Sequence, residues 1–141
     1  TQKLFGVSTD KIVNPSCGKE RPDRVFETDE LILILECDEN QHRDRACSCE
    51  QTRMVNIGQA YGGMPVYFIR WNPDNYCPES DRKKCEEIKK RHKLVGDLIK
   101  HILNKRYVLP KSSLVSAIYL YFDEWDGLDK EEWKSITPLC V

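Results

Sequence analysis

A run of five apolar residues, Leu31 to Leu35, constrains the fold of this chain more than any other sequence feature. Because consecutive positions are apolar, both faces of a strand built from them must be covered, as in the centre of an α/β sheet. The run is followed by Glu36 and Asp38, which project from the same face of an extended strand because they are two positions apart. The sequence therefore predicts a central strand that ends in two carboxylates.

The rest of the sequence predicts an α/β domain in the order β-β-α-β-α-β, a mixed β-sheet flanked by helices. Periodicity and turn residues define the elements, which we expect as strands at 24–27, 31–38, 66–71 and 114–122 and as helices at 49–60 and 81–106. We expect residues 1–141 to form one domain in which residues 123–141 are an acidic tail. No run of the chain is long and apolar enough to predict a membrane span.

Charge is segregated along the chain, although its formal net charge is only −1. Residues 27–50 carry eight acidic and two basic side chains, a net charge of −6. Residues 82–111 carry eleven basic and three acidic side chains, a net charge of +8. A basic stripe beside an acidic pocket suits a protein that holds a polyanion while a metal acts on it. A solvated helix face is the plain alternative for the basic residues.

The long helix predicted at 81–106, with Asp81 as its N-cap, combines this charge with an apolar stripe. The expected stripe residues are Cys85, Ile88, His92, Val95, Ile99 and Ile102. Within this stripe, His92 is interpreted as packed rather than catalytic. The basic residues outside the stripe are expected to contact the phosphates of a nucleic acid; they include Lys83, Lys84, Lys90 and Arg91.

Asp23, Glu36, Asp38 and His42 form the constellation with the clearest chemical meaning. Buried carboxylates at a strand end are costly unless a cation neutralises them, and carboxylate oxygens favour Mg²⁺. His42 follows soon after and could serve as a general base or bond a phosphate oxygen. Each residue also has a simpler interpretation: Asp23 as a turn former, His42 as a surface residue, and the strand-end carboxylates as solvated at a sheet edge.

These residues resemble the motif of the PD-(D/E)xK nuclease superfamily: Arg-Pro-Asp at 21–23, a hairpin, then Glu-x-Asp-x-x-Gln-His at 36–42. The resemblance is closest to the very-short-patch repair (Vsr-like) endonucleases and related small domains. It continues through Glu50-x-x-Arg53 and Pro-Val-Tyr-Phe-Ile-Arg-Trp-Asn at 65–72, so that it covers residues 21–74. The same stretch is also similar to sequences of large DNA viruses.

The resemblance implies a restriction-endonuclease-like fold and a Mg²⁺- or Mn²⁺-dependent endonuclease that nicks or cleaves DNA. Asp23 and Glu36 would be the motif acids, and Asp38 stands where the commonest motif has Lys, so that His42 or a second metal would prepare the water. Glu50 would support His42 or the metal, and Arg53 would hold the scissile phosphate. A surface ion pair between Glu50 and Arg53 is the alternative interpretation. Removal of Glu36 is expected to relieve carboxylate repulsion and to leave the fold intact.

The seven cysteines include two close pairs, which are Cys47 with Cys49 and Cys77 with Cys85. In a reducing compartment, paired cysteines are interpreted as metal ligands before disulfides, so we expect an intracellular protein of the cytoplasm or nucleus. A structural Zn²⁺ held by all four thiolates is one hypothesis, which the Vsr-like resemblance favours, and Cys85 as a core residue is the alternative.

Two other classes of function stay open beside the endonuclease. One is a catalytically inactive nucleic-acid-binding module of the same fold, and the other is a zinc-stabilised interaction module. The expected partner is DNA without a membrane, with the chain acting within a larger parent protein or as a homodimer.

Overall fold

The computed structural model describes residues 22–42, 47–78, 85–110 and 114–136. Their strands are β1 (Arg24–Glu27), β2 (Ile32–Cys37), β3 (Val66–Trp71), β4 (Val115–Leu120) and β5 (Lys134–Ser135). The helices are α1 (Cys47–Gln59) and α2 (Ile88–Leu103), with short 3₁₀ turns η2 (Glu39–His42) and η3 (Leu128–Lys130). None of the helices in these described ranges is long and apolar enough to span a membrane.

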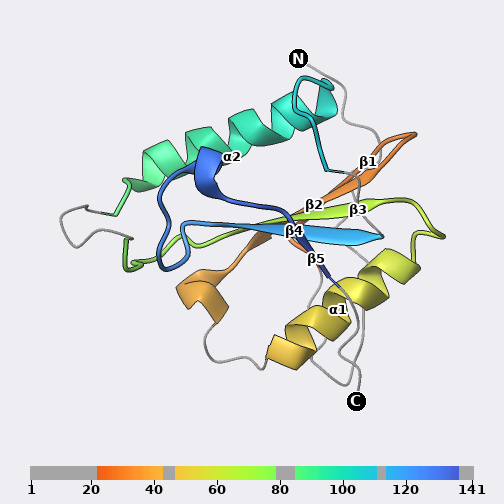
Figure 1. Cartoon of the computed structure of the whole chain (residues 1–141), viewed down its shortest axis with the longest axis horizontal. Helices are drawn as coiled ribbons and strands as arrows, with labels where there is room; N and C mark the ends of the chain where they lie inside the picture. Colours follow the sequence, from red (N-terminus) through yellow and green to blue (C-terminus); the bar gives the residue numbers. More distant parts are fainter. Residues whose placement is uncertain (1–21, 43–46, 79–84, 111–113, 137–141) are drawn as a thin grey trace.

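The strands form one sheet in the order β1-β2-β3-β4-β5 (Figure 1). The β2–β3 and β3–β4 pairs are parallel, whereas the outer pairs β1–β2 and β4–β5 are antiparallel. The prediction of an α/β protein with a mixed sheet flanked by helices is therefore confirmed. The short strand β5 was not predicted, and it extends the sheet beyond β4.

Helices α1 and α2 cover opposite faces of the sheet (Figure 1). Met54 and Ile57 of α1 pack with Ile34 and Phe68 on one face. The connections β2–α1–β3 and β3–α2–β4 each move one strand along the sheet in the same direction, but their helices lie on opposite faces. The two connections therefore have opposite handedness. One of them is therefore left-handed, which is rare. Each face of the sheet has its own helix and its own group of buried apolar residues.

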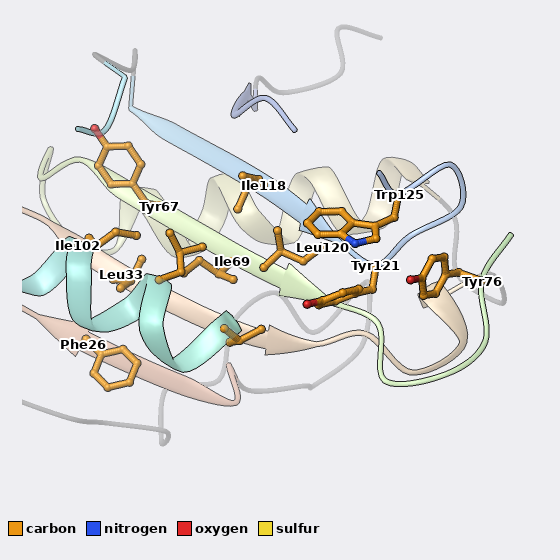
Figure 2. Packing of buried hydrophobic residues seen from close by; sticks show 12 residues of the cluster. Phe26, Leu33, Tyr67, Ile69, Tyr76, Ile102, Ile118, Leu120, Tyr121 and Trp125 are labelled. Carbon is orange, nitrogen blue, oxygen red and sulfur yellow. The ribbon is translucent and has the colours of Figure 1, made fainter. Parts of the chain in front are cut away.

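The core on the α2 face is rich in aromatic rings (Figure 2). Leu33, Ile69 and Leu120 supply its aliphatic part from the three central strands. Tyr121 follows β4, and its ring lies 4.7 Å from that of Trp125. Residues 123–136 were predicted as part of an acidic tail, but they contribute to the core and form strand β5. The reason is that burial of their aromatic and apolar side chains, Trp125 and Ile136, stabilises them against the sheet although many of their neighbours are acidic.

Helix α1 approaches the sheet closely because of a glycine. A Cβ atom at Gly58 would lie 2.4 Å from a methyl carbon of Val115 in β4, so that any larger residue would push the helix outward. The end of α1 at Gln59 agrees with the helix predicted at 49–60, and Gly62 and Gly63, which follow it, have positive φ, 64° and 92°. The close packing sets the position of the last turn of α1 over the sheet.

Helix α2 begins later than predicted. It starts at Ile88, with Cys85 to Glu87 outside the helix, and the expected N-cap Asp81 lies outside the described residues. Tyr76 explains the late start, because its backbone contacts the Cys85 sulfur and its hydroxyl accepts a hydrogen bond from the Glu86 amide, 3.0 Å away. These contacts hold the segment before the helix against the loop that follows β3.

The apolar stripe predicted for this helix is also displaced. The buried residues of α2 are Arg91, Val95, Leu98 and Ile102, whereas Ile88 is 43% exposed. His92 is exposed rather than enclosed in the stripe, although its ring meets the ring of Trp71 edge-on at 5.2 Å. The prediction was right for Val95 and Ile102, which are buried, and wrong for Ile88 and His92, which are exposed, because it did not allow a buried arginine.

Candidate functional site

The candidate site lies at the carboxyl ends of the parallel strands β2 and β3. Glu36 pairs in register with Arg70 of β3, and Asp38 follows the end of β2 directly. Both acids share a face with Ile34 and Phe68, which is the face covered by α1. Ligands of open α/β sheets characteristically bind beyond this edge of the strands.

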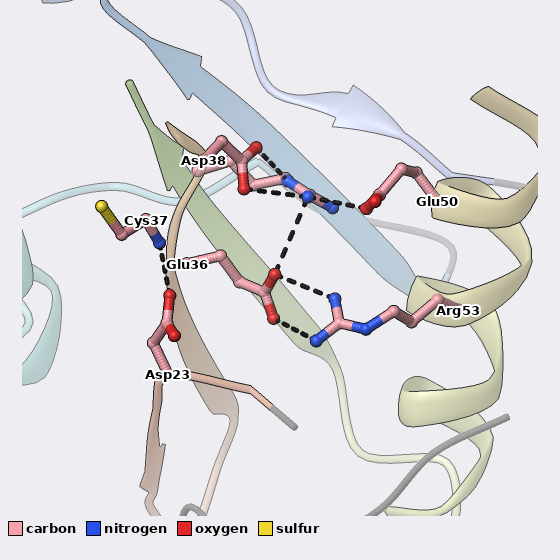
Figure 3. Close-up of polar contacts among 7 residues, drawn as sticks. Asp23, Glu36, Cys37, Asp38, Glu50 and Arg53 are labelled. Carbon is pink, nitrogen blue, oxygen red and sulfur yellow. Dashed lines mark hydrogen bonds and ion pairs between the residues drawn. The ribbon is translucent and has the colours of Figure 1, made fainter. Parts of the chain in front are cut away.

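Glu36 forms a two-point ion pair with Arg53 of α1 (Figure 3). Its two carboxylate oxygens accept hydrogen bonds from Nη1 and Nη2 of Arg53 at 2.9 and 2.8 Å. Only 4% of each residue is exposed. Burial raises the pKa of Glu36 above its usual range, although Arg53 and Arg70 oppose this shift. The ion pair therefore offsets part of the cost of charging this buried carboxylate.

Arg70 connects the remaining acids of the site. Its Nε and Nη2 atoms donate to the two oxygens of Asp38 at 2.6 and 2.9 Å, and Nη2 also donates to Glu50 at 2.7 Å. Burial would lower the pKa of Arg70, but the carboxylates of Asp38, Glu36 and Glu50 hold it above its ordinary value. We call Glu36, Asp38, Glu50, Arg53 and Arg70 the carboxylate–arginine cluster.

Asp23 stands at the edge of this cluster, just before β1. Its Oδ2 atom accepts a hydrogen bond of 2.6 Å from the backbone amide of Cys37, which lies between Glu36 and Asp38 in the chain (Figure 3). Burial raises the pKa of the Cys37 thiol to about 12, with further contributions from nearby carboxylates that include Asp23. Cys37 therefore stays a neutral thiol, and Asp23 lies beside the end of β2.

The cation that neutralises the buried carboxylates is supplied by arginine in this structure. Arg70 lies within the strand predicted at 66–71 but was not predicted as a site residue. The sequence does contain a sign of this role for Arg70. A charged residue at an inward position of an otherwise apolar strand, Val-Tyr-Phe-Ile-Arg-Trp, needs a buried counterion. The counterions are Glu36, which lies directly opposite Arg70 on β2, and Asp38, two residues further along the chain.

Two predictions for α1 are corrected. Arg53 was expected to hold the scissile phosphate, but both of its terminal nitrogens bond Glu36 and its side chain is buried. The alternative, a surface ion pair between Glu50 and Arg53, is also wrong, because Glu50 pairs with Arg70. Residues three apart on a helix can meet, but here the two side chains find stronger partners on the sheet.

The turn that contains His42 is held by a side-chain clasp, the pair Gln41 and Asp123. Gln41 Nε2 donates to Asp123 Oδ1 at 3.0 Å, and the Asp123 amide donates to Gln41 Oε1 at 2.8 Å. The same Asp123 oxygen accepts the Cys77 amide at 2.8 Å. Gln41 has φ 55°, which is uncommon for a residue with a side chain. The clasp joins the segments that follow β2, β3 and β4. The side chain of His42 lies outside the part of the chain that the structure describes.

Loss of the clasp is expected to cost about 1 kcal/mol of unfolding free energy, the usual net worth of a hydrogen bond. Asp123→Ala and Gln41→Ala should each lower the urea midpoint, and the double variant should cost less than the sum of the two single variants, because both of them lose the bond from Gln41 Nε2 to Asp123 Oδ1. Asp123→Asn keeps the accepting Oδ1 and serves as the matched control. Strictly additive losses would contradict a shared contact.

The donor chemistry at this edge fits Mg²⁺. Four carboxylates against two arginines leave a formal charge of −2, and carboxylate oxygens are the ligands that Mg²⁺ prefers. Arg53 Nε is buried and has no hydrogen-bond partner among the described residues, so the cluster has capacity for another oxygen. Within the described ranges, however, no three metal-ligating side chains stand together as a ready-made group. The residues therefore fit Mg²⁺ in the type of their ligand atoms and in their net charge.

The four predicted zinc ligands are described only in part. The Cys47 side chain lies outside the described residues, while Cys49 sits in the first turn of α1 and Cys77 is exposed. Cys85 Sγ donates to the Tyr76 carbonyl at 3.0 Å and packs against the α2-face core, as its alternative interpretation held. The zinc site stays a prediction.

The predicted nucleic-acid contacts have different outcomes. Lys83 and Lys84 lie outside the described residues, and Lys90 is exposed on α2. Arg91 is 4% exposed, so the prediction that it contacts phosphate is wrong. Its guanidinium donates to the carbonyl oxygens of Glu86, Asn72 and Asp74 and lies 5.0 Å from the ring centre of Tyr76. Arg91 therefore anchors α2 to the loop after β3.

Comparisons of the chain with protein-family models, with curated proteins and with solved structures found no match. Only the side chains and their geometry therefore bear on the function of this chain.

Proposed function

We propose that this protein is a metal-dependent phosphodiesterase that cleaves a nucleic acid, with DNA as the expected substrate. The observation that supports this most is that four acids, Asp23, Glu36, Asp38 and Glu50, lie at or beside the carboxyl edge of the sheet. These acids come from three separate segments of the chain and keep a net negative charge after pairing with arginine. Asp23 is exposed, so the edge is open to solvent on one side.

Asp23 and Glu36, with help from Asp38, would hold Mg²⁺ or Mn²⁺ in this proposal. A bound Mg²⁺ supplies a water of lowered pKa and positive charge for a phosphate that becomes more negative during the reaction. Arg53 and Arg70 fix the carboxylate orientations, because each holds its main partner at two points. His42, in the turn after β2, is assigned the proton of the attacking water.

A second candidate is a nucleic-acid-binding module that does not cleave. The observation in its favour is that Glu36 and Asp38 already have arginine partners at both oxygens, as in a structural ion network. A zinc-stabilised interaction module belongs to the same class of non-catalytic functions, and bound stoichiometric zinc without Mg²⁺ affinity would favour it.

Nicking of supercoiled plasmid separates the two candidates. The protein should nick the plasmid in Mg²⁺ or Mn²⁺ and should stop when the metal is chelated. Asp23→Asn, purified in parallel, reports contaminating nuclease and should be inactive, since Asn keeps an oxygen for the Cys37 amide but loses the charge. Plasmid binding without any metal-dependent nicking would instead establish the non-cleaving module.

A further inference from the structure

A pocket of ≈ 350 Å³ lies on α2, on the face of the sheet opposite the carboxylate–arginine cluster. Its floor is formed by apolar parts of four residues, which are Leu94, Leu98, Tyr107 and Leu128. Sites for small ligands are concave, mostly apolar, and begin at about 300 Å³. The pocket is therefore large enough for one ring system and its substituents.

The floor is held in place by neighbouring contacts. Trp133 Nε1 donates to the Tyr107 hydroxyl at 3.1 Å, and the Trp133 ring meets Tyr67 edge-on at 5.6 Å. Leu98 is 2% exposed and belongs to the core, whereas Leu94 and Tyr107 are half-buried. The Tyr107 ring is thus a fixed, accessible aromatic surface.

The rim of the pocket is cationic. Lys90 and Lys93 line it on the solvent side together with His101, and all three are exposed. The single acid of the lining, Asp97, forms an ion pair of 2.7 Å with Lys93. With His101 neutral, the lining keeps a formal charge of +1. An apolar floor below a cationic rim suits an anion that carries a ring.

We propose that this pocket binds one nucleotide of a nucleic-acid strand, with the base on the floor beside Tyr107 and its phosphate at Lys90 and Lys93. Aromatic side chains that stack bases, combined with lysines that follow the backbone, are the usual means of holding single strands. The choice of a nucleotide rests on the proposed function, whereas the shape and charge of the pocket do not. Because the acids lie on the other face, the pocket would hold a strand and not cleave it.

Binding can be measured apart from cleavage by titrating ¹⁵N-labelled protein with thymidine 5′-monophosphate in metal-free buffer. Saturable shifts should centre on the amides of Leu94, Tyr107 and Leu128. Thymidine and inorganic phosphate should each bind at least ~10-fold more weakly, because each lacks one half of the ligand. Equal binding of phosphate alone, or no saturable shift at these amides, would overturn the proposal. Equal competition by naphthoate would show a general site for aromatic acids and overturn the nucleotide assignment.

Variants test the two halves of the pocket. Tyr107→Ala should weaken nucleotide binding ~10-fold or more through lost stacking, whereas Tyr107→Phe keeps the ring, loses only the contact with Trp133, and should bind more tightly than Tyr107→Ala. Lys90→Glu should weaken binding, with Lys89→Glu on the same helix outside the pocket as its control. Asp97→Asn should strengthen binding by removing the one acid of the lining. Unchanged affinity in both Tyr107→Ala and Lys90→Glu would refute the site. Plasmid nicking is scored separately, so failure of the pocket and failure of the acid site are distinguishable.

Discussion

Replacing Arg70 with methionine should destabilise the protein by about 3–5 kcal/mol, the cost of removing one partner from a buried ion pair. Arg70 is 2% exposed and bonds Asp38 and Glu50, with Glu36 3.7 Å away, so the change leaves three carboxylates without their shared cation. Urea unfolding monitored by tryptophan fluorescence measures the loss. Arg24→Met, an exposed arginine in β1, is the matched control and should change stability little.

The same variant should respond to pH in a defined direction. Burial already raises the folded-state pKa of Glu36, and loss of Arg70 should raise it further. A folded state whose acid has a raised pKa binds more protons than the unfolded state, so stability falls as pH rises through that pKa. The deficit of Arg70→Met should therefore shrink towards acidic pH and be largest above the raised pKa of Glu36. Adding Asp38→Asn should recover part of the loss at neutral pH. Equal unfolding midpoints of Arg70→Met and wild type would contradict the buried network.

Glu36→Gln should reduce metal-dependent cleavage to the level of the chelated control and should lose less stability than Glu36→Ala. Glutamine preserves the shape of the side chain and one oxygen for Arg53, but it removes the charge that a metal requires. Plasmid nicking at matched protein concentration measures the loss, and thermal unfolding confirms that the variant is folded. Wild-type cleavage by Glu36→Gln would show that the residue is structural and not a metal ligand.

Glu36→Ala should differ from Glu36→Gln in stability. The sequence predicted that removing this acid would relieve repulsion and leave the fold intact. The structure reverses that expectation, because Arg53 would remain buried without its carboxylate, at a cost of about 3–5 kcal/mol. Combining Glu36→Ala with Arg53→Met should recover stability, since both charges are then removed. A single Glu36→Ala variant as stable as wild type would argue against the ion pair.

Local patterns were sufficient for most of the elements that position the site. The apolar run Leu31 to Leu35 predicted the central strand, and the helix predicted at 49–60 ends at Gln59. The gap at 28–30 between the first two predicted strands is a turn, in which the Oγ1 of Thr28 accepts the amides of Glu30 and Leu31. The strand predicted to end at 71 does so, and the Oδ1 of Asn72 after it accepts the Asp74 amide. These predictions succeeded because each depends on residues only a few positions apart.

Helix α2 shows where local patterns fail. Its apolar periodicity was real, but the buried stripe runs through Arg91 and leaves His92 exposed. Arg91 can be buried only because carbonyl oxygens of the loop after β3 and the ring of Tyr76 meet it. Those partners are distant in sequence from the helix face they fill, so periodicity alone could not reveal them.

The sequence by itself determined which acids lie at the strand ends, because strand alternation places Glu36 and Asp38 on one face wherever the strand is built. Only the tertiary structure decided their partners. Arg70 reaches the acids through the parallel pairing of β2 with β3, and Arg53 through the packing of α1 on the sheet. Buried charges must be paired, but which arginine pairs with which carboxylate depends on contacts between elements, and chain-local patterns do not contain these contacts.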